Sequence, residues 1–158
     1  MIRAALPLVA AALLAMPVAA KDSLGVYSGW AAFRDDSPKR CYAIAKPTRN
    51  SDAAPFASVG TWPQRGVRGQ IHIRLSRAIR DGSDVRLSVG DRRFTLAAKG
   101  RNAWAADNSM DAAIIAAMRS ASRMTVSARA ENGAQFSERY NLAGAATAID
   151  AAVVGCAG

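Results

Sequence analysis

Polar and apolar residues alternate most regularly in the central part of the chain. Every second residue of 69–76 (GQIHIRLS) is apolar, and 84–89 (DVRLSV) repeats the pattern. A period of two predicts a β-strand that buries one face. Gly90-Asp91 then provides a two-residue turn, in which glycine tolerates a positive φ, before 92–98 (RRFTLAA) returns. The sequence therefore predicts a strand followed by a β-hairpin.

The expected turn at Gly90 also fixes the register of this hairpin. With that register, apolar residues face apolar residues on one side of the hairpin, and polar residues face polar residues on the other. The expected pairs are Val85–Leu96, Leu87–Phe94, Arg86–Thr95 and Ser88–Arg93.

Shorter stretches with strand-like alternation lie on both sides of the hairpin. Between them stand clusters of Asp, Asn, Ser, Pro and Gly, which favour turns. Residues 35–38 (DDSP) and 131–133 (ENG) are such turns, and 46–55, with two prolines and no apolar period, is typical of a loop. The further strands expected are 25–33, 40–45, 56–62, 123–130 and 135–142.

Two segments have a helical rather than a strand-like period. In 108–120 apolar residues recur every four positions, with Asn108 as the expected N-cap and Asp111 near the positive end of the helix dipole. The alanine-rich 143–154 predicts a second, short helix. Its apolar side is expected to include Ile149 and Val153.

Many short strands with two brief helices predict a mainly β protein. The architecture expected is a β-sandwich or flattened barrel of short antiparallel strands with two short helices. A hydrophobic content of 51% is sufficient for a core and excludes a wholly disordered chain. Residues 21–158 are therefore expected to form a single domain.

The first 20 residues have the layout of a secretory signal peptide. Arg3 precedes an apolar stretch, and small residues end at Ala20, after which we expect cleavage. The alternative is an uncleaved anchor, but the stretch is short and alanine-rich for crossing roughly 30 Å of hydrocarbon. We expect a periplasmic or secreted protein with no integral membrane span after cleavage.

The chain has two cysteines, Cys41 and Cys156. In an oxidising compartment such a pair is expected to form a disulfide. Closing a loop of about 115 residues stabilises the fold by roughly 4–5 kcal/mol in the chain-entropy model. The alternative is a Cys41 nucleophile served by His72, which requires both thiols to remain reduced outside the cytoplasm.

Several of these features together resemble the invasion-associated locus B family of exported bacterial proteins. They are Trp30 on an early strand, the following Cys41-Tyr42, the helix at 108–120, and an ending that contains Phe136, Leu142-Ala143-Gly144-Ala145 and Ala148-Ile149. The resemblance implies a mainly β, non-enzymatic protein of the periplasm or outer surface. It also implies a place in a family that is linked to host-cell invasion.

Catalytic chemistry has few candidates in this sequence. One histidine and two cysteines are too few for a closed zinc site, and we expect no metal or cofactor. Ser28 stands one position late for a Gly-x-Ser-x-Gly elbow, and Asp35-Asp36 is expected to form a turn rather than an acid–base pair or a cation site. His72, on the polar face of its strand, would have to serve any small hydrolase, which is the less favoured alternative.

Net charge gives a better lead to function. The chain has 21 Lys+Arg and 12 Asp+Glu, and loss of Arg3 with the signal peptide leaves 20 − 12 = +8. The alternation places Arg74, Arg86 and Arg93 on one polar face. We expect Arg65 and Arg68 in the loop that enters it. Guanidinium groups match phosphate and carboxylate, so the five arginines are candidates for anion binding; the alternative is a solvated basic face.

The expected partner is an anionic envelope component: lipopolysaccharide, lipid head groups or a cell-wall polymer. An envelope protein that binds a sheet edge or the C-terminal helix is the alternative. Nucleic acid is not expected, because an exported protein seldom meets it and the arginines lack interleaved aromatic residues. Trp30, Trp62 and Trp104 are expected in core or rim packing rather than in a sugar-stacking platform.

Overall fold

The computed structural model describes residues 21–49 and 51–157, so the expected signal peptide lies outside the described residues. Within them, ten antiparallel strands form one sheet in the order β1-β2-β3-β4-β5-β8-β7-β6-β9-β10. The strands are β1 (Asp22–Tyr27), β2 (Trp30–Asp36), β3 (Lys39–Ala45), β4 (Phe56–Trp62), β5 (Val67–Arg74), β6 (Val85–Val89), β7 (Arg92–Lys99), β8 (Asn102–Trp104), β9 (Arg123–Arg129) and β10 (Gln135–Asn141). The helices are η1 (Pro63–Arg65), α1 (Asn108–Ser120) and α2 (Ala145–Gly155).

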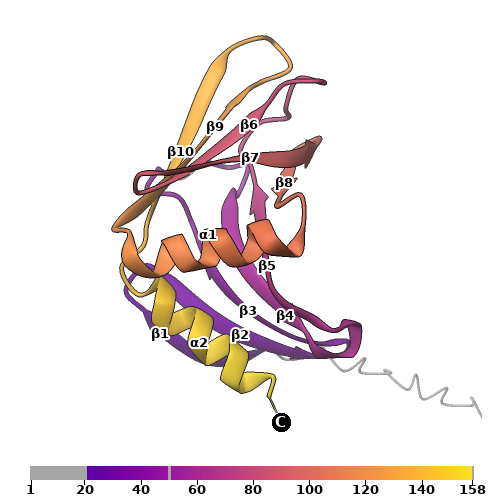
Figure 1. Ribbon diagram of the computed structural model, residues 1–158, viewed down its shortest axis with the longest axis vertical. Helices are drawn as coiled ribbons and strands as arrows, with labels where there is room; N and C mark the ends of the chain where they lie inside the picture. Colours follow the sequence, from indigo (N-terminus) through magenta and orange to yellow (C-terminus); the bar gives the residue numbers. More distant parts are fainter. Residues whose placement is uncertain (1–20, 50, 158) are drawn as a thin grey trace, which may run out of the picture.

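The sheet bends around the two α-helices, which pack on its inner side (Figure 1). Helix α2 packs against β1, β2 and β3, whereas α1 contacts β5, β6, β7 and α2. Strand pairing does not close the sheet, because β1 and β10 are its two ends. The fold is therefore mainly β, as expected, and an open sheet of this kind is consistent with a sandwich or flattened barrel.

Strand β10 is at one end of the sheet, next to β9. Side-chain hydrogen bonds also link it to the other half of the sheet. The Trp30 indole N–H donates to the carbonyl of Asn141 at 2.9 Å, and the amide of Ser76 donates to the buried Glu138 carboxylate at 2.6 Å. The Tyr140 hydroxyl donates to the same carboxylate at 3.3 Å. Burial, together with this neighbouring negative charge, raises the pKa of Tyr140 well above its ordinary value. Tyr140 therefore stays protonated and remains a donor.

Strand β8 connects the two halves of the sheet. Its three residues pair with His72–Arg74 of β5 on one side and with Ala97–Lys99 of β7 on the other. The sequence analysis did not predict β8, because three residues are too few to show a period. The hairpin of β7 and β8 is held by Arg101, whose Nε donates to the carbonyl of Leu75 at 2.9 Å.

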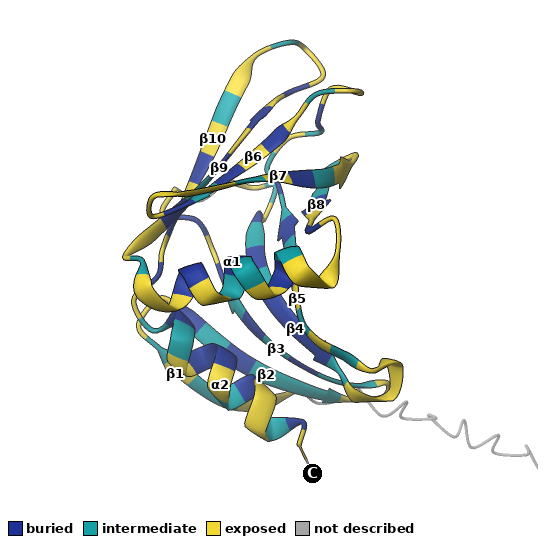
Figure 2. Cartoon of the chain, viewed as in Figure 1, coloured by how far each residue is buried: buried dark blue, intermediate teal, exposed yellow. Residues whose placement is uncertain are grey.

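The core lies between the inner face of the sheet and the two helices. Buried and exposed residues alternate along the strands, as Figure 2 shows. The register predicted for the β6–β7 hairpin is confirmed at all four expected pairs. The largest fully buried side chains are Trp30, Tyr140, Ile71, Ile73, Leu75, Leu87, Ile114, Met118, Met124, Val85, Val89 and Val126.

The prediction of a single strand over 25–33 is wrong. The structure divides this stretch into β1 and β2, which pair around a turn at Ser28-Gly29. Ser28 has a φ of 53°, in the left-handed region that a non-glycine residue seldom adopts. Apolar residues run through both strands, so only this two-residue turn marks the division in the sequence.

Both helices differ from expectation in single residues. The N-cap of α1 is Asp107 rather than Asn108, and its carboxylate accepts from the amide of Met110 at 2.8 Å. In α2, Ile149 is buried as expected, but Val153 is 47% exposed. The buried positions of α2 are Ala145, Ala148, Ile149 and Ala152, a stripe of helical spacing that leaves Val153 outside.

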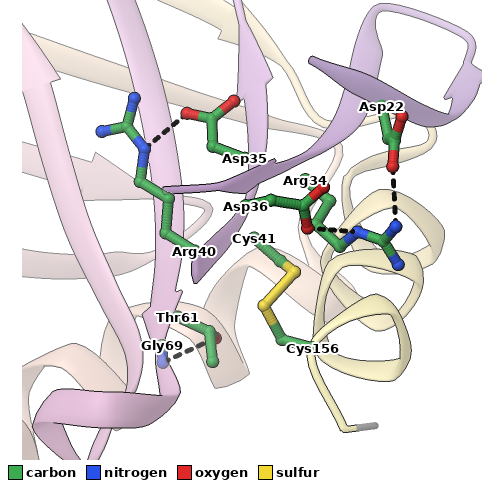
Figure 3. The surroundings of a disulfide bond; sticks show 9 residues. All are labelled: Asp22, Arg34, Asp35, Asp36, Arg40, Cys41, Thr61, Gly69 and Cys156. Atoms are coloured by element: carbon green, nitrogen blue, oxygen red, sulfur yellow. Dashed lines mark hydrogen bonds and ion pairs between the residues drawn. A yellow bond between two sulfur atoms is a disulfide. The ribbon is translucent and has the colours of Figure 1, made fainter. Parts of the chain in front are cut away.

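The expected disulfide between Cys41 and Cys156 is confirmed, with a Cα–Cα distance of 5.8 Å. Both cysteines are buried, and the bond ties the end of α2 to β3 on the inner face of the sheet. Figure 3 shows Arg40, the neighbour of Cys41 along β3, pointing away from the disulfide towards Asp35. The side chains of these adjacent residues of β3 thus point to opposite faces of the sheet.

Candidate functional site: the outer face of the sheet

Two of the five expected anion-binding arginines lie together on the outer face of β6 and β7. Arg86 pairs with Thr95, and Ser88 pairs with Arg93, so all four side chains point away from the core. A depression of about 520 Å³ lies at this place. It is lined by Arg86, Ser88, Arg93, Phe94, Thr95 and Ser127.

The basic surface continues across β9 and β10. Arg86 pairs with Ser127 of β9, and the β9–β10 register aligns Arg129 with Gln135. Alternation along these two strands therefore brings three more exposed arginines onto the outer face. We call the resulting surface the arginine face; it consists of Arg86, Arg93, Arg123, Arg129 and Arg139.

The three arginines of β9 and β10 were not among the residues predicted from the sequence. Alternation in 123–130 and 135–142 already separated their polar and apolar sides. It could not show that β9 pairs with β6, which follows from the long-range order of the strands. The sequence thus indicated which side of each strand carries the arginines, but it did not indicate which strands lie next to one another.

The outer residues of β6, β7, β9 and β10 include no Asp or Glu among the residues that the structure describes. Among the described residues, an ion pair at the edge of this surface joins Arg86 to Asp84, at 3.7 Å, and both side chains are mostly exposed. Such a pair contributes little free energy and is easily exchanged for another anion. Hydroxyl side chains lie between the arginines: Ser88, Thr95, Thr125, Ser127 and Ser137.

Turn carbonyls position two guanidinium groups of the arginine face. Arg93 Nη1 donates to the carbonyl of Gly90 at 3.0 Å, and Arg129 Nη1 donates to that of Gly133 at 2.7 Å. Each contact involves one of the five N–H donors of an arginine. The arrangement orients both groups beside the turns that end their hairpins.

The other three candidate arginines lie elsewhere. Arg74 is half-buried on the outer face, but β8 and β7 separate its strand from β6. Arg65 belongs to η1, and Arg68 lies within β5 rather than in the expected loop. A bulge at this point pairs Arg68 with Thr61, whose side chain is buried with Cys41, so Arg68 leaves the outer face.

His72 is half-buried on the outer face of β5. Its Nε2 lies 3.0 Å from the Asn102 side-chain oxygen, which can only accept, so Nε2 is the donor. Ser58 of β4 is the residue that pairs with His72, but the Ser58 hydroxyl donates to the backbone carbonyl of His72 at 3.4 Å rather than to its ring. Cys41 is bound in the disulfide, which excludes the Cys41–His72 alternative.

A second depression, of about 620 Å³, lies beside His72 on the outer face. Its walls include the rings of Tyr42, Phe56, Trp62 and Trp104, and we call it the aromatic groove. Trp30 alone of the three tryptophans is fully buried in the core. Trp62 and Trp104 were expected in core or rim packing, and both lie at the wall of an open groove.

A match to a known protein family identifies the family of the chain. A family model described as Invasion associated locus B (IalB) protein matches residues 32–153. The chain belongs to the IalB family. The matched range begins within β2 and ends within α2, so it includes the whole arginine face and most of the aromatic groove. Searches of curated proteins and of solved structures found no match.

IalB membership and the Cys41–Cys156 disulfide both fit an exported protein. None of the helices in the described part of the chain has the length and apolar character needed to cross a membrane. Membership also accounts for the resemblance carried by Cys41-Tyr42, α1 and the Leu142–Ile149 segment, which all fall within the matched range.

Proposed function

We propose that this IalB-family protein is an exported, non-enzymatic binding protein whose arginine face engages anionic components of the cell envelope. The observation that supports it is that Arg86 and Arg93 line one depression, on strands whose described outer residues include no carboxylate. An anion that binds there meets two guanidinium groups and the hydroxyls of Ser88, Thr95 and Ser127, and it competes with the exposed Asp84 for Arg86. Such a surface attracts anions at a distance and orients them on contact.

The chemistry of the arginine face suits phosphate and carboxylate groups. A guanidinium offers two parallel N–H donors to either anion, and neighbouring Ser and Thr hydroxyls add further donors. Lipopolysaccharide phosphates, anionic lipid head groups and acidic cell-wall polymers present these groups in the compartment expected for the protein. The arginine face contains no stacked row of aromatic rings, so single-stranded nucleic acid is a poor match.

The test is binding of the mature protein to envelope fractions, and to vesicles with and without anionic lipid, at low and high salt. We expect retention at low salt that is lost at high salt, because added ions screen exposed charges over about 10 Å or less. The double variant Arg86→Glu with Arg93→Glu should weaken low-salt binding by about tenfold or more, since it replaces charge-assisted donors with repelling groups.

The matched control is Arg65→Glu with Arg68→Glu. It changes the net charge by the same amount, but its two residues lie away from the depression. Binding should stay within a few-fold of the unaltered protein. Equal losses of binding in the two double variants would show that binding depends on net charge and not on the arginine face. Binding that Arg86→Glu with Arg93→Glu leaves unchanged would refute the proposed function.

A second candidate function is assembly with an envelope protein through β1 or the end of α2. Strand β1 is an edge of the sheet, where Val26 is 71% exposed, and Val154 on α2 is 73% exposed. Edge strands readily accept a further strand from a partner. This function predicts co-purification that is insensitive to salt and to the arginine variants but is reduced by Val26→Lys or Val154→Lys.

A further inference from the structure

The aromatic side chains of the groove come from two consecutive strands, β3 and β4, and from β8, which is distant in the sequence. Tyr42 comes from β3, Phe56 and Trp62 from β4, and Trp104 from β8. Trp104 is 36% exposed, which is high for so large an apolar side chain. The groove volume of about 620 Å³ lies within the range of roughly 300–1,000 Å³ that is common for small-ligand sites.

Gly60 gives the Trp62 ring its place in the groove. A Cβ atom added at Gly60 would lie 2.5 Å from two atoms of the ring, so the indole packs directly on the β4 backbone. Gly60 also pairs with Tyr42 on β3 and Gln70 on β5. A side chain at position 60 would therefore displace the ring without removing any aromatic residue.

Polar side chains stand between the rings of the groove. Gln70 and Ser58 line it, and His72 lies edge-on to Phe56 with ring centroids 5.4 Å apart. A pyranose needs this mixture, because its axial C–H bonds form an apolar patch that packs on an aromatic face while its hydroxyls require donors and acceptors. An acyl chain would leave the amide and hydroxyl groups without partners, at a cost in free energy.

Positive charge gathers on the Tyr42 side of the groove. Lys21 Nζ lies 5.9 Å and Arg40 Cζ 5.2 Å from the centroid of the Tyr42 ring. Arg40 is held in place by Asp35, whose carboxylate accepts from Arg40 Nε at 2.7 Å (Figure 3). The described residues that line the groove include no Asp or Glu. Asp35 balances the charge of Arg40, so Lys21 leaves a net positive charge beside Tyr42, and a ligand that fits the rings gains from a negative charge there.

We propose that the aromatic groove binds a short stretch of an acidic glycan. Its pyranose rings stack on Trp62 and Trp104, and its carboxylate lies towards Lys21 and Arg40. The proposal is independent of the arginine face, because none of the five arginines of that face lines the groove. It assigns the ligand by sugar ring and carboxylate together, whereas the arginine face requires only an anion.

The test uses a tetramer of galacturonate as the acidic probe and maltotetraose as a neutral probe of the same length. Binding is measured by calorimetry and by tryptophan emission, which reports on the groove because Trp30 is buried elsewhere. We expect the acidic tetramer to change the emission and to bind about tenfold more tightly than maltotetraose at low salt. Lys21→Gln should reduce this preference about threefold.

Two variants probe the rings. Trp104→Ala and Gly60→Ala should each weaken binding of the acidic tetramer about fivefold or more, the first by removing a ring and the second by moving one. Trp104→Phe should restore most of the affinity. Thermal unfolding of every variant confirms that it is folded before its binding is compared.

The variant Arg86→Glu with Arg93→Glu separates this proposal from the proposed function. Its emission response to the acidic tetramer should persist, even if its binding to envelope fractions is lost. The glycan site is refuted if neither tetramer changes the emission, if the two bind equally well, or if Trp104→Ala and Gly60→Ala leave affinity unchanged. The glycan site would also be refuted if anionic vesicles bound in the groove, as read from the tryptophan emission, in preference to the acidic tetramer.

Discussion

Asp111 is a buried carboxylate with a structural task. Its Oδ1 accepts from the amide of Ile71 at 2.8 Å, at a point of β5 beyond the end of β8. Burial raises the pKa of Asp111, and this effect outweighs the lowering by the Ile71 amide. The sequence predicted only a favourable charge at the start of a helix; the partner, 40 residues away, requires the packed fold.

Asp111→Asn should be neutral or stabilising at pH 7, because the amide oxygen still accepts from Ile71 and no charge is buried. Asp111→Ala should lower the free energy of unfolding by about 1–3 kcal/mol, since it leaves a buried donor without a partner. Urea unfolding of both variants measures the difference. Equal losses in the two would contradict the acceptor role.

The raised pKa of Asp111 also predicts a pH dependence. Between the ordinary carboxyl pKa and the raised one, the folded state binds more protons than the unfolded chain, so stability falls as pH rises through this interval. The contribution is complete below the ordinary value. Unfolding of the unaltered protein across this interval should show the decline, and Asp111→Asn should lack that part of it.

Gly144 is required at the start of α2 for two reasons. Its φ is +84°, and an added Cβ would collide with the carbonyl oxygen of Tyr27 in β1. We expect Gly144→Ala to lower the free energy of unfolding by about 3 kcal/mol or more. Gly133→Ala is the matched control, because Gly133 has a φ of +82° with open space around it. The control should lose only about 1–2 kcal/mol; equal losses would show that the collision costs nothing.

At the scale of elements, α2 depends on a covalent attachment. The helix is rich in alanine, so it buries small side chains, and its last residues precede Cys156. The disulfide holds this end against β3, across a sequence separation of 115 residues. Packing and cross-link together keep the helix on the inner face.

Replacing both cysteines by alanine should lower the free energy of unfolding by about 4 kcal/mol, because the unfolded chain regains the entropy that the loop had removed. Chemical unfolding of the double variant against the oxidised protein gives this value. A difference below about 1 kcal/mol would mean that the cross-link adds little to packing.

Elements with a long, regular period could be predicted from the sequence, and short or irregular ones could not. The register of the β6–β7 hairpin was predicted correctly, and its strand ends to within one residue, because its turn and both of its faces agree. Strand β8 is too short for any period, and the turn between β1 and β2 uses Ser28 in a conformation that its sequence does not signal.

At the scale of the whole molecule, two chemically different zones occupy one continuous outer face. The first half of the sheet presents the aromatic groove, and the second half presents the arginine face. Alternation predicted that Arg86 and Arg93 share a side, but it grouped them with Arg74, and Arg65 and Arg68 were expected in the loop that enters the same face. The bulge that turns Arg68 away depends on local backbone geometry, and strand order brings Tyr42 and Trp104 to the walls of one groove.

The long span of the disulfide has a consequence for how the protein responds to a protease. Strands β4 to β10 and both α-helices lie between Cys41 and Cys156, as does the exposed connection between β3 and β4. A protease that cuts this connection would therefore release no fragment. The nicked chain would remain one covalent molecule and would separate into two pieces only after reduction.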